Sequence, residues 1–184
     1  MKYLTQKHFY YGAILSAIIE YNPDASLVLL EQKEDSRKVY HIQTSTAKQE
    51  CVIFFKHAFE KKIKPNSWLF EFSPEDKAEL KDYEDRQIPT FIYLLCATDE
   101  LRGSQIAVLK YRDEFERVLD KKAFTVSTKK NFPDFYLHKS KRADDVVRIP
   151  RNRIEKTFDD LISEVVRESG GYYCPNCGHN IVLK

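Results

Sequence analysis

The chain has 184 residues, of which 42% are hydrophobic and 32% charged, and its formal net charge is +2. This length suits one domain of ordinary size with a short appendage, and the apolar content excludes an intrinsically disordered chain. No stretch approaches the roughly 18 apolar residues of a membrane-spanning helix, and residues 1–8 have no signal-peptide pattern. Cys51 and Cys96 lie inside apolar runs, as reduced cysteines do. We therefore expect a cytoplasmic protein without a membrane partner.

The apolar pattern predicts a helix and a hairpin at the start of the chain. Residues 9–21 have helical spacing and stop at Asn22-Pro23. The β-prone runs 26–32 and 38–44 are separated by a polar turn, which predicts a hairpin. Apolar residues recur at helical spacing over 47–62, so a second helix is expected there.

The middle of the chain is predicted to supply the centre of a sheet. A short strand is expected at 68–72, and Ser73-Pro74-Glu75-Asp76 then combines an N-cap, a first-turn proline and two acids, which predicts a helix start. The uninterrupted apolar run 90–97 predicts a strand covered on both faces, with 105–111 as its neighbour. A short helix is expected over 112–119.

The last third of the chain is predicted to contain short strands and an amphipathic helix. The strands are expected at 123–127, 135–137 and 146–149. The helix is expected to start after Pro150, with Ile154 and Phe158 on its apolar face. This order of elements predicts an α/β (α+β) fold, a mixed β-sheet flanked by helices, over residues 1–168. Residues 169–184 form a separate tail.

The tail contains the motif Cys174-Pro175-Asn176-Cys177-Gly178-His179. A Cys-x-x-Cys turn followed by glycine places two thiolates on one ion, while backbone N–H groups hydrogen-bond the sulfurs. The motif therefore predicts a structural zinc site with Cys174, Cys177 and His179 as ligands. The fourth ligand is expected from His138, His57 or another chain, and the last source would make a homodimer.

The surroundings of the motif bear on its chemistry. The flanking residues 170–173 and 180–183 resemble the two strands of a zinc-ribbon hairpin, although a ribbon normally has two Cys-x-x-Cys turns. Redox proteins use the same motif, but there it opens a helix after a strand. This context favours a metal site over a redox pair.

Charge is distributed unevenly along the chain. Residues 71–100 include nine acidic and three basic residues, whereas residues 121–156 include eleven basic and four acidic residues with aromatic rings between them. Converging cations bind phosphates and aromatic rings stack on unpaired bases, so the basic segment predicts contact with DNA or RNA. A solvated, loop-rich face is the alternative interpretation. The candidate residues are Lys129, Lys130, Lys139, Lys141, Arg142, Arg148, Arg151 and Arg153.

The first helix and hairpin also contain a sparse set of polar residues. Glu20 lies near the end of the helix and Glu31 on the first strand, while the second strand includes Tyr40-His41-Ile42-Gln43-Thr44-Ser45. This layout, over about residues 8–120, resembles the restriction-endonuclease-like, or PD-(D/E)XK, nucleases, in which such groups hold Mg²⁺. His41 and Gln43 stand where that family has an acidic residue or Gln and a lysine. A neutral Gln cannot replace the lysine cation.

Three functions are compatible with these patterns. The resemblance implies a nuclease-like core that has lost cleavage but binds nucleic acid, with a structural zinc tail, as in bacterial mobile elements or defence loci. The first alternative is an active Mg²⁺-dependent nuclease that uses Glu20, Glu31, His41 and Gln43. The second is a protein-interaction scaffold that dimerises through the zinc tail. The alternative to the resemblance is that Glu20 and Glu31 are solvated charges and His41 is a half-buried strand histidine.

Overall fold

The computed structural model describes residues 3, 6–33, 37–44, 50–62, 64–98, 102–140, 145–168, 171–173 and 180–182. The helices are α1 (Gln6–Tyr21), α2 (Pro74–Asp85) and α3 (Phe158–Glu168), with shorter helical turns at η1 (Tyr111–Phe115), η2 (Glu116–Val118) and η3 (Arg151–Glu155). The strands are β1 (Ala25–Lys33), β2 (Arg37–Thr44), β3 (Glu50–Lys61), β4 (Lys64–Glu71), β5 (Thr90–Ala97), β6 (Gln105–Lys110), β7 (Ala123–Thr128), β8 (Asp134–His138), β9 (Val146–Pro150), β10 (Gly171–Tyr173) and β11 (Asn180–Val182). The predicted α+β fold, a mixed sheet with helices, is confirmed.

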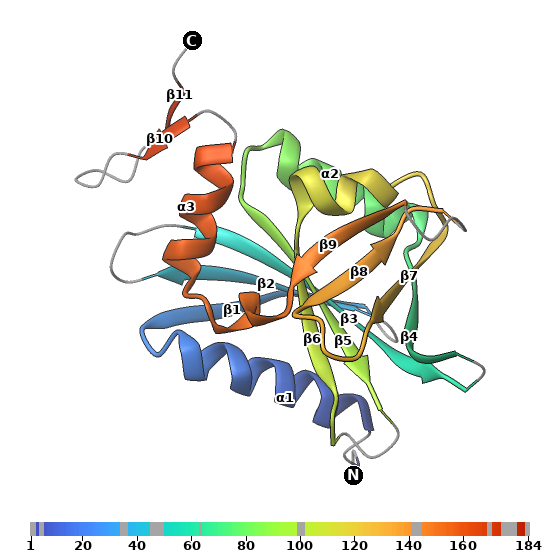
Figure 1. Ribbon diagram of the computed structural model, residues 1–184. Coiled ribbons are helices and arrows are strands. Elements are labelled where there is room, and N and C mark those ends of the chain that lie inside the picture. Colours follow the sequence, from blue (N-terminus) through green and yellow to red (C-terminus); the bar gives the residue numbers. More distant parts are fainter. Residues whose placement is uncertain are drawn as a thin grey trace.

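Strand β3 joins two parts of one large sheet (Figure 1). It pairs antiparallel with β2 and parallel with β5, so that β1, β2, β3, β5 and β6 form what we call the inner sheet. The last two residues of β3 pair with β4, which continues through β7 and β8 to β9. We call β4, β7, β8 and β9 the outer sheet.

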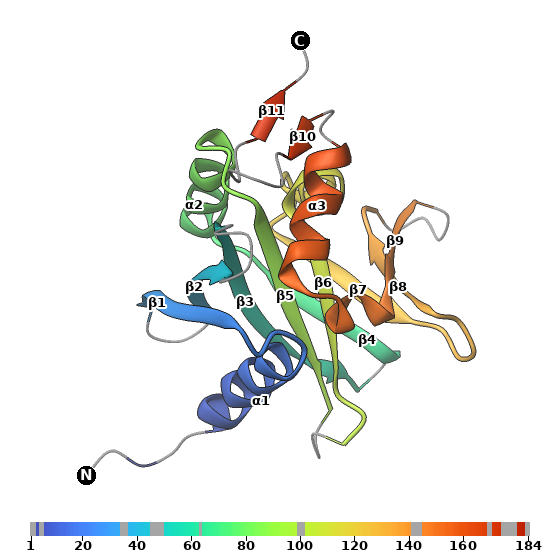
Figure 2. The ribbon, with the colours of Figure 1, turned by 90° about the vertical axis from the view of Figure 1, so that its left-hand side faces the viewer.

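The inner sheet is covered on both faces. In β5, Phe91 and Tyr93 belong to a hydrophobic cluster with residues of α1 and α3, whereas Ile92 and Leu94 belong to a cluster with the outer sheet and Leu80 of α2. This alternation follows from the two-residue period of a strand. Figure 2 shows α1 and α3 in front of the inner sheet. The layers are therefore helices, inner sheet and outer sheet, and the expected doubly covered strand at 90–97 is confirmed.

The prediction of a helix over 47–62 is wrong, because residues 50–61 form strand β3. Cys51, Val52, Ile53, Phe54 and Phe55 are all buried, and they alternate between the two hydrophobic clusters. A strand that is covered on both faces has apolar residues at almost every position, so a helical spacing can be found within it by chance. Pairing on both edges of β3 overrides that local pattern.

Two other helices also differ from the prediction. The segment after β6 does not form a regular helix, because Arg112 has extended dihedral angles and Asp113 has a φ of 71°. The last helix starts at Phe158 rather than after Pro150, and the Oγ1 of Thr157 accepts a hydrogen bond from the backbone N–H of Asp160 at 3.2 Å. Thr157 thus caps α3, while Arg151–Glu155 is a separate 3₁₀ turn.

The start of α2 agrees with its sequence signal. The Ser73 Oγ accepts a hydrogen bond from the Asp76 N–H at 3.1 Å, and the Asp76 carboxylate accepts one from the Ser73 N–H at 2.9 Å. This reciprocal pair is a capping box.

None of the helices in the described ranges is long and apolar enough to cross a membrane.

Candidate nucleic-acid interface

The exterior face of the outer sheet is built from alternate residues of four strands. Their neighbours in sequence, such as Trp68, Val126 and Leu137, point into the core between the sheets. One row of the exterior face runs across β4, β7, β8 and β9 through Ser67, Ser127 and Tyr136, which are buried, to the exposed Arg148. The next row runs through Leu69, Thr125, His138 and Val146.

His138 is surrounded by lysines from three elements. The pKa of His138 is lowered by burial and further by the positive charges of Lys64, Lys129 and Lys61. Its Nε2 lies 2.8 Å from the Ser127 Oγ, which is a hydrogen-bond distance. Burial is the larger cause of the lowered pKa, and the three lysines add to it because a positive charge disfavours a second one nearby.

The lysines reach the exterior face from the ends of their strands. Lys61, the last residue of β3, donates from Nζ to the Thr125 Oγ1 at 3.3 Å. Lys129 follows β7, and its Nζ lies 4.5 Å from the centroid of the Tyr136 ring. Tyr136 is buried, and the Lys129 ammonium lies over one face of its ring. Lys64 at the start of β4 is exposed.

These cations are not neutralised within the described part of the chain. We define the basic face as Lys61, Lys64, Lys129, His138 and Arg148. In the described ranges none of its lysines and arginine forms an ion pair with a carboxylate. The basic face therefore offers a group of charges suited to a polyanion.

The turn between β7 and β8 extends the basic face toward an exposed ring. Asn131 has a φ of 66°, which closes the turn and leaves the side chain of Phe132 53% exposed. The Nη1 of Arg151 donates to the Phe132 carbonyl oxygen at 3.3 Å, and Lys130 is exposed in the same turn. An exposed aromatic ring among cations is a feature of proteins that stack unpaired bases.

The predicted nucleic-acid contacts are only partly brought together. Lys129 and Arg148 lie on the basic face, and Lys130 and Arg151 lie at its turn. Lys139 is instead paired with Asp145, with its Nζ 2.6 Å from the carboxylate. Lys141 and Arg142 lie outside the described residues.

Arg153 does not belong to this surface, so its prediction as a phosphate contact is wrong. Its side chain is 6% exposed, and its two terminal nitrogens donate to the Glu114 carboxylate at 2.6 and 2.8 Å. The Nη1 also donates to the Val108 carbonyl oxygen at 2.8 Å. A helix start had been expected here, with Arg153 at its surface. The 3₁₀ turn directs this side chain inward instead.

Sequence reasoning missed Lys61 and Lys64. They lie at the end of β3 and the start of β4, which pair antiparallel at Lys61 and Lys64. The expected helix over 47–62 placed Lys61 on a different element from the basic segment 121–156. The run of basic residues at 61, 62 and 64 was a local signal, but its closeness to His138 follows from strand pairing.

The structure does not bring the nuclease-like residues into one described site. Glu20 is exposed on α1, which packs on the face of the inner sheet that contains Tyr40 and Ile42. His41 alternates with them and is half-buried toward the other face. In the backbone register Glu31 lies opposite Val39, and Gln43 lies opposite Ser26. No group of three His, Cys, Asp or Glu side chains within the described ranges is arranged to hold a metal ion.

The zinc motif, with Cys174, Cys177 and His179, lies outside the described residues. The strands expected on either side of it are present: β10 and β11 pair antiparallel, with Tyr173 opposite Asn180. His57 packs its ring against Tyr10, with centroids 5.3 Å apart. Figures 1 and 2 show β10 and β11 beyond the end of α3, apart from β3 and β8, which contain His57 and His138.

A scan against protein-family models and a search of curated proteins give no match to this chain. Its function is therefore inferred from its own geometry and charge.

Proposed function

We propose that the protein binds nucleic acid through the basic face and does not cleave it. The observation that carries the proposal is the convergence of Lys61, Lys64 and Lys129 around His138, without carboxylate partners among the described residues. Binding to phosphates releases counterions from the nucleic acid, so unneutralised lysines are the groups that gain most from such a contact.

The residues of the β1–β2 hairpin support the proposal that the protein does not cleave nucleic acid. Gln43 stands where the similar nucleases have a lysine, and a neutral amide cannot supply that positive charge to the attacking water. Glu20 and His41 also belong to opposite sides of the inner sheet. A metal-dependent nuclease that uses both side chains would need them around one ion.

Single strands are the favoured ligand class. The exposed ring of Phe132 lies in the same turn as Lys129 and Lys130. Stacking on such a ring requires an unpaired base, because the bases of a duplex are already stacked. We therefore expect single-stranded DNA or RNA to bind more tightly than the duplex of the same sequence.

The test is a fluorescence-anisotropy titration with labelled single- and double-stranded DNA and RNA, at two salt concentrations and with Mg²⁺ present. The variant K61A/K64A/K129A is expected to lose at least tenfold in affinity and to show a weaker salt dependence. The control K81A/R117A/K122A removes three exposed positive charges elsewhere and should bind nearly as well as the unaltered protein. Equal losses in both variants would mean that only net charge matters.

The same samples, run on a gel, separate binding from cleavage. Intact products support the noncatalytic module. Mg²⁺-dependent fragments that disappear in the Glu31→Ala variant would establish the active nuclease instead. A protein that binds neither DNA nor RNA at low salt would be a protein-interaction domain.

We place the protein in the cytoplasm, where free buried cysteines such as Cys51 and Cys96 remain reduced.

We also propose that Cys174, Cys177 and His179 bind a structural zinc ion. Support comes from the hairpin register, because Tyr173 and Asn180 lie opposite each other and the motif connects them. Such closely spaced ends suit a compact metal loop. Since His57 and His138 lie on strands apart from this hairpin, a ligand from a second chain is the favoured fourth group.

Metal analysis combined with light scattering tests the zinc proposal. The C174S/C177S variant should lose bound zinc and, if the fourth ligand comes from another chain, become a monomer. The C51A/C96A variant removes two thiols from the buried core and should keep the metal. Unchanged zinc content in C174S/C177S would contradict the proposal.

A further inference from the structure

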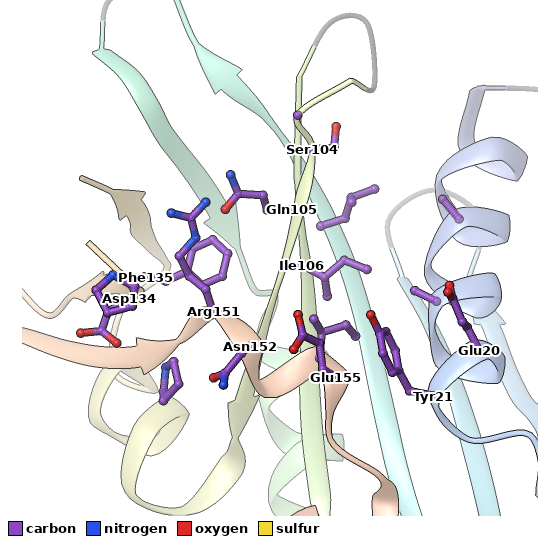
Figure 3. Close-up of a pocket in the computed structure, with 17 residues that line it drawn as sticks. Glu20, Tyr21, Ser104, Gln105, Ile106, Asp134, Phe135, Arg151, Asn152 and Glu155 are labelled. Atoms are coloured by element: carbon purple, nitrogen blue, oxygen red, sulfur yellow. The ribbon is translucent and has the colours of Figure 1, made fainter. Parts of the chain in front are cut away.

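A cavity of about 1100 Å³ lies between α1, β6 and the η3 turn (Figure 3). Ala13 and Ala17 face it from α1, four residues apart and hence on one side of the helix. Their small side chains leave space that larger residues would fill. Leu95, Ile106 and Ile154 supply an apolar wall. Pockets of this size and character bind small organic molecules.

The polar groups around the cavity are mostly hydrogen-bond acceptors. Glu20 of α1 and Glu155 of η3 line it, and neither carboxylate has an ion-pair or hydrogen-bond partner in the described part of the chain. The Oε1 of Gln105 is buried and lacks a donor there too. This acceptor has no exposed surface, so the exposed carboxylates of Glu20 and Glu155 are the acceptors that a ligand in the cavity meets.

The charge of the cavity is negative. Asp134 is a third carboxylate in its lining, against the single guanidinium of Arg151. Arg151 already donates to the Phe132 carbonyl oxygen and lies 5.8 Å from the centroid of the Phe135 ring. The positive charge of Arg151 therefore lies at the side of the cavity next to Phe132 and Phe135. Figure 3 shows Tyr21 between Glu155 and Glu20, where its ring can contact a cation.

We propose that this cavity binds an organic cation, in which an apolar or aromatic body carries an ammonium, amidinium or guanidinium group. The body packs on Ala17, Ile106 and Ile154, and the cationic group lies against the Tyr21 ring, where the negative charges of Glu20 and Glu155 attract it. The site adjoins the turn of the basic face at Arg151, has the opposite charge to the basic face, and does not depend on nucleic-acid binding.

Benzamidine, benzamide and benzoate test the proposal, because the three probes have similar shapes but are cationic, neutral and anionic. Binding is followed by amide chemical-shift changes and by calorimetry. Benzamidine is expected to bind at millimolar concentrations or below, benzamide more weakly, and benzoate not at all. The shifted amides should belong to α1, β6 and η3.

Variants identify the groups responsible. E20Q/E155Q keeps the side-chain shapes and should weaken benzamidine binding at least tenfold, whereas D85N/E116Q, which alters two exposed acids elsewhere, should have no effect. Ala17→Leu puts a larger side chain into the space where the ligand body packs and should weaken binding. If Ala17→Leu fails to fold, E20Q/E155Q still decides. Equal binding of benzoate, no binding of benzamidine, or unchanged affinity in E20Q/E155Q would overturn the proposal.

Discussion

Two arginines that are two residues apart in the sequence have opposite roles. Arg151 lies at the surface beside Phe132, whereas the guanidinium of Arg153 is buried against the carboxylate of Glu114. The backbone N–H of Lys110 also donates to this carboxylate, at 2.8 Å, so the ion pair joins η3 to the end of β6. Both partners are tightly enclosed, and breaking such a pair leaves an unpaired buried charge.

The Glu114→Gln variant is expected to lower the free energy of unfolding by about 3–5 kcal/mol, because the buried charge of Arg153 loses its opposite charge. The double variant E114L/R153M removes both charges and should lose much less. Urea denaturation measures both effects. A similar loss in Glu114→Gln and in the double variant would show that packing, rather than charge, is decisive.

Arg151→Ala should leave stability within about 0.5 kcal/mol of the unaltered protein but weaken nucleic-acid binding.

At the scale of the elements, the sequence predicted those helices and strands whose own residues determine their structure. The capping residues Ser73 and Asp76 marked the start of α2, and the apolar run 90–97 marked the buried strand β5. Strand β3 was missed, because a helical spacing can be found in it although the β-branched and aromatic run 52–55 favours a strand, and pairing with β2 and β5 makes it extended. The same limit applies to the candidate site. Lys129 and Arg148 were visible as a basic segment, but Lys61 reaches His138 only through the β3–β4 connection.

For the whole molecule, the net charge of +2 conceals a separation of charge. Cations gather on the exterior of the outer sheet, and carboxylates line the cavity beside α1. A small net charge gives weak long-range attraction to polyanions, whereas a local group of cations still gives a short-range, salt-dependent contact. The proposed ligands of the two sites therefore have opposite charges and should not compete.

Because His138 is a titratable member of the basic face, it links nucleic-acid binding there to pH. Burial and the charges of Lys64, Lys129 and Lys61 lower the pKa of His138 below its ordinary 6.5, so the imidazole of the free protein is neutral at pH 7. The unfolded chain takes up this proton first, and the contribution of His138 to stability falls as the pH drops from about 6.5 through the lowered pKa.

Bound phosphates reverse the local potential and raise that pKa, so binding takes up a proton. We expect affinity for single-stranded nucleic acid to increase as the pH falls from about 7 to 5.5, while the free protein becomes less stable. His138→Gln should remove much of both dependences, whereas His8→Gln, a change on the exposed side of α1, should keep them. Anisotropy titrations and thermal unfolding across this pH range measure the two effects. A His138→Gln variant with an unchanged pH profile of binding would place the nucleic acid away from the basic face.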